Sequence, residues 1–196
     1  YRKLLKQRNA WLRQAGTVQT EEDPWLALIT ETGHLINELR EEYLKDFAHH
    51  FSWVLKRLDS KLSCHFEYNV GGYEKNLADT RKKMTEALQR EVKLGSTQLG
   101  PHRADLIIRM DEASAGETAS RGQGKAIASA AALAQASLMA DKHQRPSLVL
   151  IDDIGAEFDS EHRVNLLRVL AGIGSQVVAT ATESLPEALS VLSADR

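Results

Sequence analysis

Several features that would assign a function at once are missing from this sequence. Its 196 residues include a single cysteine, Cys64, which excludes an internal disulfide and favours a reducing compartment. No apolar run approaches the roughly 20 residues that a membrane-spanning helix needs, and the charged first residues do not resemble a signal peptide. The phosphate-binding pattern G-x-x-x-x-G-K-[ST] is also absent. We therefore expect no membrane partner and no complete nucleotide site.

An excess of charge of either sign is lacking as well. The chain has 25 Lys and Arg against 27 Asp and Glu, a formal net charge of −2, so a globally basic nucleic-acid surface is excluded while a local patch stays possible. Residues 1–14 are predicted to form an amphipathic helix. It carries five basic residues and no acidic one: Arg2, Lys3, Lys6, Arg8 and Arg13. They form either a solvated helix face or a contact to nucleic acid.

The first half of the chain is predicted to be mainly helical. Apolar residues at helical spacing predict one long helix, or two separated by a kink, from Trp25 to Leu58. A polar turn over 16–23 precedes it, and a strand over 63–70 and a helix over 77–92 follow. Because the chain begins at Tyr1 rather than Met, we expect it to be part of a longer polypeptide.

The second half alternates strands and helices, which is typical of α/β layering with some parallel strands. Strands are predicted over 104–110, 148–151 and 176–180, with helices over 122–140, 160–171 and a short one from Pro186. The strand over 148–151 is apolar on both faces, so we expect it to be a central strand, and we also expect the strand over 176–180 to be buried. The sequence thus predicts a helical arm domain over 1–95 and an α/β domain over 96–196.

A helix start suited to anions occurs at Ser120. Ser120 is a good N-cap, and Gly122 and Gly124 would leave backbone N–H groups open to a phosphate at the positive end of the helix dipole. Arg121 and Lys125 add positive charge. A Ser-x-Gly helix start is nevertheless most often only a cap, so this segment alone does not decide between the two roles.

Two carboxylates follow the strand at 148–151. Asp152 and Asp153 would stand at the carboxyl end of that strand, where open α/β sheets place functional groups. One carboxylate there can hold Mg²⁺, directly or through water, and the next can orient an attacking water. The alternative is a strand end that meets a solvated loop. Asp159, shortly afterwards, is by itself an N-cap.

The order of these segments is more specific than any one of them. A Ser-x-Gly-Gln helix start, an apolar strand ending in Asp-Asp, and then Ala156-Glu157-Phe158-Asp159 resemble the signature motif, Walker B strand and D-loop of ABC-type ATPases of the SMC class. Further segments narrow the resemblance to the RecF family of bacterial recombination proteins: Tyr1, Leu5-Lys6-Gln7-Arg8-Asn9 and Gly100-Pro101-His102-Arg103-Ala104-Asp105-Leu106. Physical chemistry alone gives no reason for His102 and Arg103.

The resemblance implies roles for individual residues. Ser120, Gly122 and Gln123, with Arg121 beside them, would contact ATP bound to a second subunit. Asp152 would hold Mg²⁺ through water, and Asp153 would be the catalytic carboxylate. The D-loop residue at the dimer interface would be Asp159. Most ABC proteins carry a switch His after the last core strand, and here that role is unassigned, with Thr180 or Thr182 as candidates to reach the phosphate.

The resemblance also implies a fold and a function. The fold would be a partial P-loop ATPase lobe with a helical arm, and the whole protein a slow ATPase that uses ATP and Mg²⁺ to dimerise on duplex DNA near single-strand gaps. It would act in recombinational repair, replication restart and the SOS response, in the nucleoid-associated cytoplasm, with RecR and RecO-type mediator proteins. The chain alone is expected to be inactive. The alternatives are a non-catalytic protein-interaction module and another SMC-like ATPase with a truncated arm.

Overall fold

The computed structural model describes residues 1–15, 22–144, 146–157 and 159–182, and these divide into two compact units. Unit 1 comprises Tyr1–Tyr43 and Glu67–Ile107, and unit 2 comprises Leu44–Phe66 and the chain from Ile108 onward. Neither unit coincides with the predicted arm or α/β domain, because each is built from two separate segments of chain. The functional boundary near residue 95 stays a prediction.

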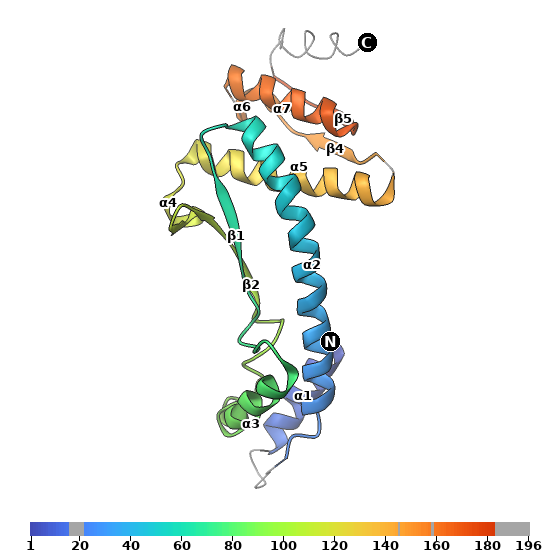
Figure 1. The fold of residues 1–196 in the computed structure, drawn as a ribbon, viewed down its shortest axis with the longest axis vertical. Helices are drawn as coiled ribbons and strands as arrows, with labels where there is room; N and C mark the ends of the chain where they lie inside the picture. The colour runs from blue at the N-terminus through green and yellow to red at the C-terminus, as the bar shows by residue number, and fades with distance from the viewer. Residues whose placement is uncertain (16–21, 145, 158, 183–196) are drawn as a thin grey trace. The chain divides into compact units, whose positions relative to one another are not determined.

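Unit 1 is built from helices whose ends follow local sequence signals (Figure 1). It contains α1 (Arg2–Ala15), the first part of α2 (Leu26–Leu58) and α3 (Leu77–Leu94). The α3 helix begins at Asn76, whose side chain accepts from the Asp79 amide, and it ends at Gly95 in the left-handed conformation. These helices confirm the predicted ones, and α2 is a single helix of 33 residues.

The core of unit 1 gathers around a tyrosine. Ile29, Tyr73 and Met84 are buried together, and Tyr73 donates to the carbonyl of Ile29 at 3.1 Å. A Cβ on Gly33 would lie only 2.5 Å from the Tyr73 hydroxyl, which explains a glycine in the middle of a helix, where glycine is otherwise unfavourable by about 1 kcal/mol.

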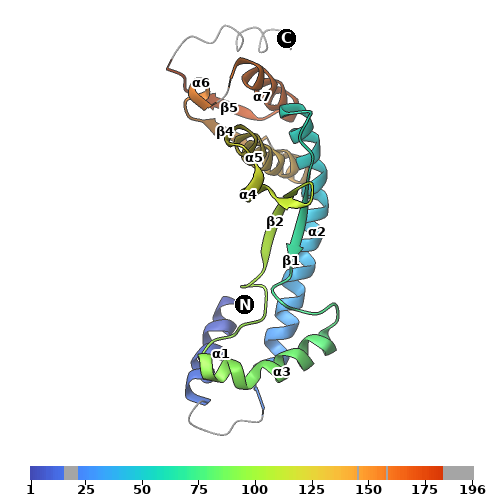
Figure 2. The same ribbon diagram turned by 90° about the vertical axis from the view of Figure 1, so that its left-hand side faces the viewer.

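Unit 2 carries the part of the chain in which the candidate site residues lie. Its helices are α4 (Ala115–Thr118), α5 (Arg121–His143), α6 (Ile154–Glu157) and α7 (Ser160–Ile173), and α5 and α7 lie alongside strands β4 (Leu148–Ile151) and β5 (Gln176–Ala179) in Figures 1 and 2. The second part of α2 packs its apolar face here, where Phe51 and Phe66 rings lie 4.8 Å apart. The sequence analysis did not predict α4 or α6.

The strands form two sheets within the described residues. The first has the order β1 (Cys64–Asn69), β2 (Asp105–Met110) and β3 (Ala113–Ser114), with β2 and β3 antiparallel. The second pairs β4 with β5 in parallel, which confirms the expected parallel strands. None of the described helices is long and apolar enough to cross a membrane. The predicted turn after residue 16 and the helix at Pro186 lie outside the described residues.

The predictions that β4 is a central strand and that β5 is buried are wrong for the described residues, where the two strands form a sheet of their own. Leu148 is 58% exposed, Leu150 70% and Val178 51%, while the alternate residues Val149 and Ile151 face inward and are partly buried. Residues in a strand point alternately to the two faces of its sheet, and α5 and α7 cover only the inward face. The outward face remains an uncovered apolar surface of the described chain.

Candidate functional site

The start of α5 is a complete capping box. The Ser120 hydroxyl accepts from the backbone N–H of Gln123 at 3.3 Å, and the Gln123 side chain accepts from the backbone N–H of Ser120 at 2.9 Å. Two N–H groups that a helix start leaves without partners are thereby satisfied. The predicted cap is confirmed. A hydroxyl that accepts still has a proton to donate, so the cap does not exclude a contact between Ser120 and an anion.

Gly122 and Gly124 have no steric reason within the described chain. A Cβ added to either residue would meet no described atom within 4 Å, and neither has a positive φ. Glycine in a helix is less favourable than alanine by about 1 kcal/mol, and its use is to permit unusual dihedrals or close approach. The backbone dihedrals do not require glycine at either position. Close approach of a group from outside the described chain would require it.

The Asp152-Asp153 turn lies at the carboxyl edge of the parallel β4–β5 pair, as the sequence predicts. Thr180, the residue after β5, makes four hydrogen bonds to this turn and to the residues that flank it. Its backbone N–H donates to the Ile151 carbonyl at 2.9 Å, and its own carbonyl accepts from Ile154 at 3.0 Å. Its hydroxyl donates to Asp152 Oδ1 at 2.7 Å and accepts from the Asp153 N–H at 2.8 Å.

The Asp153 backbone is in the left-handed region, with φ at +43°. Aspartate and asparagine tolerate this region better than other residues with a side chain, and outliers of this kind store about 1–3 kcal/mol where the surrounding structure holds them. The hydrogen bond from the Asp153 N–H to Thr180 is one such restraint. The carboxylate pair therefore stands on a turn of fixed, slightly strained geometry.

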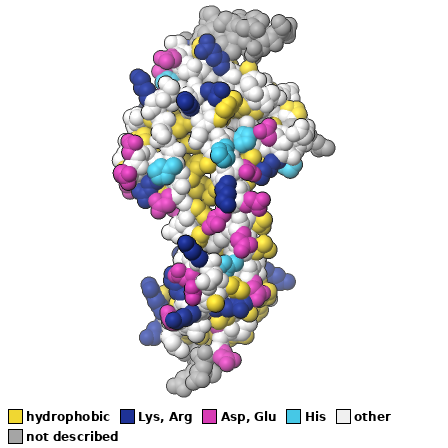
Figure 3. All heavy atoms as spheres, viewed as in Figure 1, with side chains coloured by type: hydrophobic (Ala, Val, Ile, Leu, Met, Phe, Trp, Pro, Cys, Tyr) yellow, Lys and Arg dark blue, Asp and Glu magenta, His cyan; other side chains and the backbone are white. Residues whose placement is uncertain are grey.

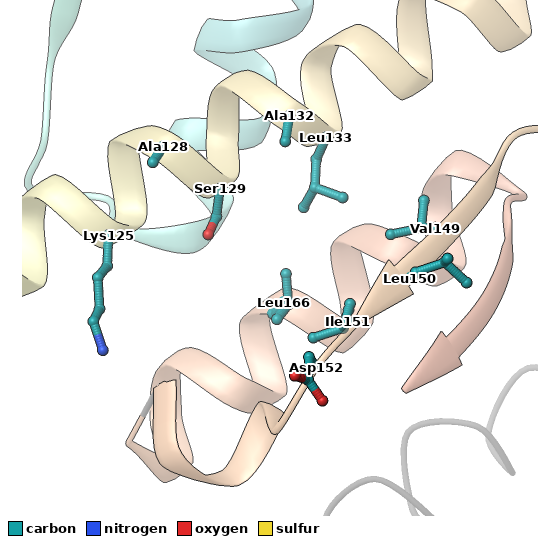
Figure 4. A pocket seen from close by; sticks show the side chains of 10 residues that line it. All are labelled: Lys125, Ala128, Ser129, Ala132, Leu133, Val149, Leu150, Ile151, Asp152 and Leu166. Carbon is teal, nitrogen blue, oxygen red and sulfur yellow. The ribbon is translucent and has the colours of Figure 1, made fainter. Parts of the chain in front are cut away.

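A pocket of about 360 Å³ lies between α5 and β4 in unit 2 (Figure 4). Lys125, Ser129 and Ala132 line it from α5, and Ile151 and Asp152 line it from the end of β4. Figure 4 shows the Lys125 and Asp152 side chains on different walls of the pocket. The structure thus brings Asp152 to the same pocket as the helix that Ser120 begins.

Asp159 caps α7, which confirms the predicted cap. Its carboxylate accepts from the His162 backbone N–H at 2.9 Å and from the His162 ring at 2.9 and 3.0 Å. These hydrogen bonds, the backbone one first, hold the pKa of the Asp159 carboxyl below its usual range. The site residues of the sequence analysis therefore fall into three clusters of unit 2: the α5 start, the β4 end and the α7 start.

Magnesium fits the β4 end as a partial site. Asp152 is exposed and supplies hard oxygen donors of the kind that Mg²⁺ prefers. Among the described residues there is no group of three or more His, Cys, Asp or Glu that could hold a metal ion. At nucleotide sites, Mg²⁺ is usually bound by one or two carboxylates, by waters and by the substrate's phosphates. A single turn with carboxylates is therefore enough as the protein's contribution to such a site.

The Gly100–Leu106 segment of unit 1 has a structural explanation that the sequence analysis lacked. His102 Nδ1 lies 3.0 Å from the Tyr1 hydroxyl and Nε2 lies 3.1 Å from the Thr97 carbonyl, so Nε2 carries the proton and Nδ1 accepts from Tyr1. Burial lowers the His102 pKa, which favours this neutral form. Gly100 has φ at +137°, and a Cβ there would collide with the Tyr1 hydroxyl. Arg103 is exposed, and its guanidinium lies 3.4 Å from the Gln98 side-chain oxygen.

Arg8 is not on a solvated or nucleic-acid-binding face, which corrects the analysis of the first helix. Its side chain is fully buried, with its guanidinium 2.6 Å from Glu91 and 2.7 Å from Asp23 and Thr97. Arg2, Lys3 and Lys6 are exposed. On the face shown in Figure 3, basic and acidic side chains are interspersed, in keeping with the near-zero net charge.

Comparison with known proteins points to one group of relatives. No family model matches the chain. Proteins called "DNA replication and repair protein RecF" are 34% identical to it in Thioalkalivibrio sulfidiphilus over 185 residues and in Marinomonas sp. over 184 residues, covering 94% and 93% of this chain. The RecF of Pseudomonas aeruginosa strain LESB58 is 32% identical over 181 residues. The chain is homologous to half of RecF. It spans 50%, 49% and 48% of the three relatives respectively.

Solved RecF structures share the fold. The structure of the recombination mediator protein RecF-ATP in the RecFOR pathway matches with a TM-score of 0.79 at 24% identity, covering 94% of this chain and 52% of that one. The corresponding RecF-ATPrS structure matches with a TM-score of 0.75 at 23% identity. The chain therefore has a mixed α/β fold that corresponds to about half of RecF, as the resemblance in the sequence predicts.

Proposed function

We propose that this chain supplies the signature-motif and Walker B portion of a RecF-like ATPase that dimerises on DNA when ATP is bound. One observation carries the proposal: an Asp-Asp turn, with Asp152 exposed and Asp153 half-buried, stands at the carboxyl edge of a parallel strand pair, and in chain order it lies between a glycine-bearing capped helix and an Asp159-capped helix. The identity of 34% to RecF over 94% of the chain supports the same order of motifs.

The proposed roles follow the exposure of the three clusters. Asp152 would hold the water shell of Mg²⁺, and Asp153 would orient the water that attacks the γ-phosphate. Bound Mg²⁺-ATP would supply the phosphoryl group and neutralise its developing charge. Ser120, Arg121, Gly122 and Gln123 would receive the nucleotide of a second subunit, because their helix start is open to solvent.

The D-loop role of Asp159 is part of the same proposal. The residue is exposed at the start of α7, where it would meet the second subunit. Its carboxylate already accepts hydrogen bonds from His162, so its orientation is set before a partner arrives. Asp159 would therefore contact the partner without having to be ordered first.

The uncovered face of β4 and β5 supports a larger ATPase lobe. Leu148, Leu150 and Val178 expose an apolar surface on a two-stranded sheet, and such surfaces mark interfaces or missing layers. The RecF relatives are about twice as long as the matched region. We propose that the remaining half of a RecF-like protein, with its phosphate-binding loop, packs on this face.

At the level of the cell, the proposal follows the RecF relatives. The whole protein would be a slow ATPase that binds duplex DNA near single-strand gaps, with RecO- and RecR-type mediators, in recombinational repair, replication restart and the SOS response. It would work in the cytoplasm at the nucleoid. The 196-residue chain alone is expected neither to bind ATP tightly nor to hydrolyse it.

The decisive experiment joins the chain to a phosphate-binding half. In a polypeptide that contains both, Asp152→Asn is expected to abolish ATP turnover and Ser120→Arg to abolish ATP-dependent dimerisation and DNA binding. Arg168→Gln, at an exposed position of α7 outside the proposed site residues, serves as the charge control. Unchanged dimerisation and DNA binding in both Asp152→Asn and Ser120→Arg would refute the proposal, as would robust ATP turnover by the 196-residue chain alone.

A non-catalytic interaction module is the second candidate, and an exposed leucine stripe favours it. Leu28, Leu35 and Leu39 lie exposed along α2 in unit 1. Exposed Glu38 and Glu42 border them, so the stripe would suit a partner helix with an apolar seam and basic edges. Leu35→Ser would then weaken binding to such a helix and leave ATP-dependent dimerisation unchanged. Loss of dimerisation in Leu35→Ser would instead assign the stripe to the ATPase itself.

A further inference from the structure

Thr180 is engaged with the Asp152-Asp153 turn more completely than sheet pairing requires. Its backbone bonds to Ile151 and Ile154 continue the β4–β5 ladder, and a residue of any type other than proline could make them. The two hydroxyl bonds, to Asp152 Oδ1 at 2.7 Å and from the Asp153 N–H at 2.8 Å, require Ser or Thr. The Thr180 side chain therefore bonds to both aspartates, which the backbone pairing of β4 and β5 does not do.

The direction of both bonds is determined by chemistry. A backbone N–H can only donate, so the hydroxyl oxygen accepts from Asp153, and the single hydroxyl proton goes to the Asp152 carboxylate. Hydrogen bonds from a hydroxyl to an ionised carboxylate are about twice as strong as neutral ones. The result is a short relay that runs from the Asp153 N–H through the Thr180 hydroxyl to Asp152.

We propose that Thr180 is the positioning residue of the carboxylate turn, an assignment that rests on the proposed ATPase function of Asp152 and Asp153. Its hydroxyl fixes one oxygen of Asp152 and leaves the rest of that carboxylate for the water shell of Mg²⁺. It also restrains the left-handed backbone of Asp153, whose carboxylate must orient the attacking water. The end of β5 thereby controls the geometry of both acids.

The same hydrogen bonds exclude a direct contact between the Thr180 hydroxyl and a phosphate in the state described. A hydroxyl has one proton, and Thr180 gives its proton to Asp152, so it cannot donate to a γ-phosphate at the same time. Contact with phosphate would require the hydroxyl to leave Asp152. Thr180 thus acts on the reaction through Asp152 and Asp153, and a movement of β5 would disturb both.

Hydrogen exchange in the 196-residue chain tests the relay without any ATPase activity. Thr180→Val keeps the shape of the side chain and removes the hydroxyl, so the Asp153 amide is expected to exchange about tenfold faster, the factor for losing one hydrogen bond of about 1.4 kcal/mol. The Ile154 and Thr180 amides should keep their protection. Thr180→Ser should behave as the unsubstituted chain, and Thr182→Val is the matched control two residues further on. Unchanged exchange at Asp153 in Thr180→Val would overturn the proposal.

Magnesium dependence tests the consequence for function in the longer protein that carries a phosphate-binding half. Thr180→Val is expected to lower kcat at least tenfold and to raise the Mg²⁺ concentration for half-maximal activity, while KM for ATP changes little. Thr180→Ser should restore both, which a general loss of stability would not explain. Normal kcat and Mg²⁺ dependence in Thr180→Val would overturn the positioning role. If the unsubstituted longer protein showed no ATP-dependent activity, the proposed function would fail, and the exchange experiment would still decide whether Thr180 holds the turn.

Discussion

The two units use their RecF-like residues in opposite ways. In unit 1, Arg8 and Gly100 are buried, and the His102 ring, although exposed, is bonded to Tyr1 and Thr97 of the same unit. In unit 2, Ser120, Gly122 and Asp152 are exposed, and the β4–β5 sheet shows an apolar face. A sequence motif can therefore persist because it builds a fold or because it faces a ligand. Only the packing around each residue separates these two reasons.

This difference leads to a simple expectation for mutations. Changes at the motif residues of unit 1 should lower stability, because each removes a hydrogen bond or ion pair within the unit or creates a clash. Changes at those of unit 2 should alter stability little and affect assembly with nucleotide instead. The four predictions below test this contrast, beginning with the largest expected effect.

Removing the buried guanidinium of Arg8 should have the largest effect. Arg8→Met would leave Glu91 without its cation in a site where both side chains are fully buried, and breaking such a pair destabilises a protein by about 3–5 kcal/mol. Urea denaturation of the 196-residue chain measures this. Arg13→Met on the same helix is the control, because Arg13 is exposed and bonds the Gly95 carbonyl at 3.3 Å. Equal stability losses in the two variants would show that the buried arginine contributes no more to stability than the exposed one.

A methyl group at Gly100 should come next. Gly100→Ala places a side chain at φ +137° and against the Tyr1 hydroxyl, which itself donates to His102. Strain at such a backbone position amounts to about 1–3 kcal/mol, so the denaturation midpoint should fall by a corresponding amount. The fluorescence of Trp11 and Trp25 in unit 1 can follow the transition. An unchanged denaturation midpoint in Gly100→Ala would show that the turn can open without loss of stability.

Acidification should weaken unit 1 through His102. Burial lowers its folded pKa below the ordinary value of about 6.5, so below that pH the unfolded chain binds more protons than the folded chain. The stabilisation is therefore present above about pH 6.5 and is lost as the pH falls through the folded pKa. Denaturation at pH 7.5 and pH 5.5 should show this loss in the chain and a smaller one in His102→Gln. His49→Gln, at an exposed position, should keep the full dependence.

The sequence predicted what local chemistry determines. The caps at Ser120 and Asp159 and the extents of α2 and α5 follow from side chains within a few residues of each element, and the structure confirms them. The parallel pairing of β4 and β5 follows from the helix between them, since parallel strands need a crossover connection. These features need no knowledge of distant partners.

The errors came from partners that are remote along the chain or lie outside it. Arg8 meets Glu91 across 83 residues, and no local pattern distinguishes that buried arginine from the exposed Lys6 nearby. Thr180 meets Asp152 across 28 residues, so its contact was missed for the same reason. The exposure of Leu150 was missed because an apolar strand indicates that a covering layer is needed and does not indicate whether that layer lies within the same chain.

The smallest change in stability, and the sharpest test of the comparison, is expected at Gly122. Gly122→Ala adds a methyl group that meets no described atom within 4 Å, so the helix should gain up to about 1 kcal/mol. Thermal denaturation of the 196-residue chain should show a small rise in Tm. In the longer protein with its phosphate-binding half, the same methyl group would occupy the space into which a second subunit's nucleotide must fit. ATP-dependent dimerisation, measured by light scattering, should then fall.

Ala128→Gly, at another exposed position of α5, is the matched control for that last variant. It should lower stability by about 1 kcal/mol, whereas Gly122→Ala should raise it, and it should leave dimerisation unchanged. If Gly122→Ala destabilised the chain, its glycine would belong with Gly100 as a packing residue. If it stabilised the chain and dimerisation persisted, the open helix start would have no ligand to admit. A more stable chain that dimerises less is the single outcome in which the glycine is kept, against helix propensity, for a molecule that arrives from outside.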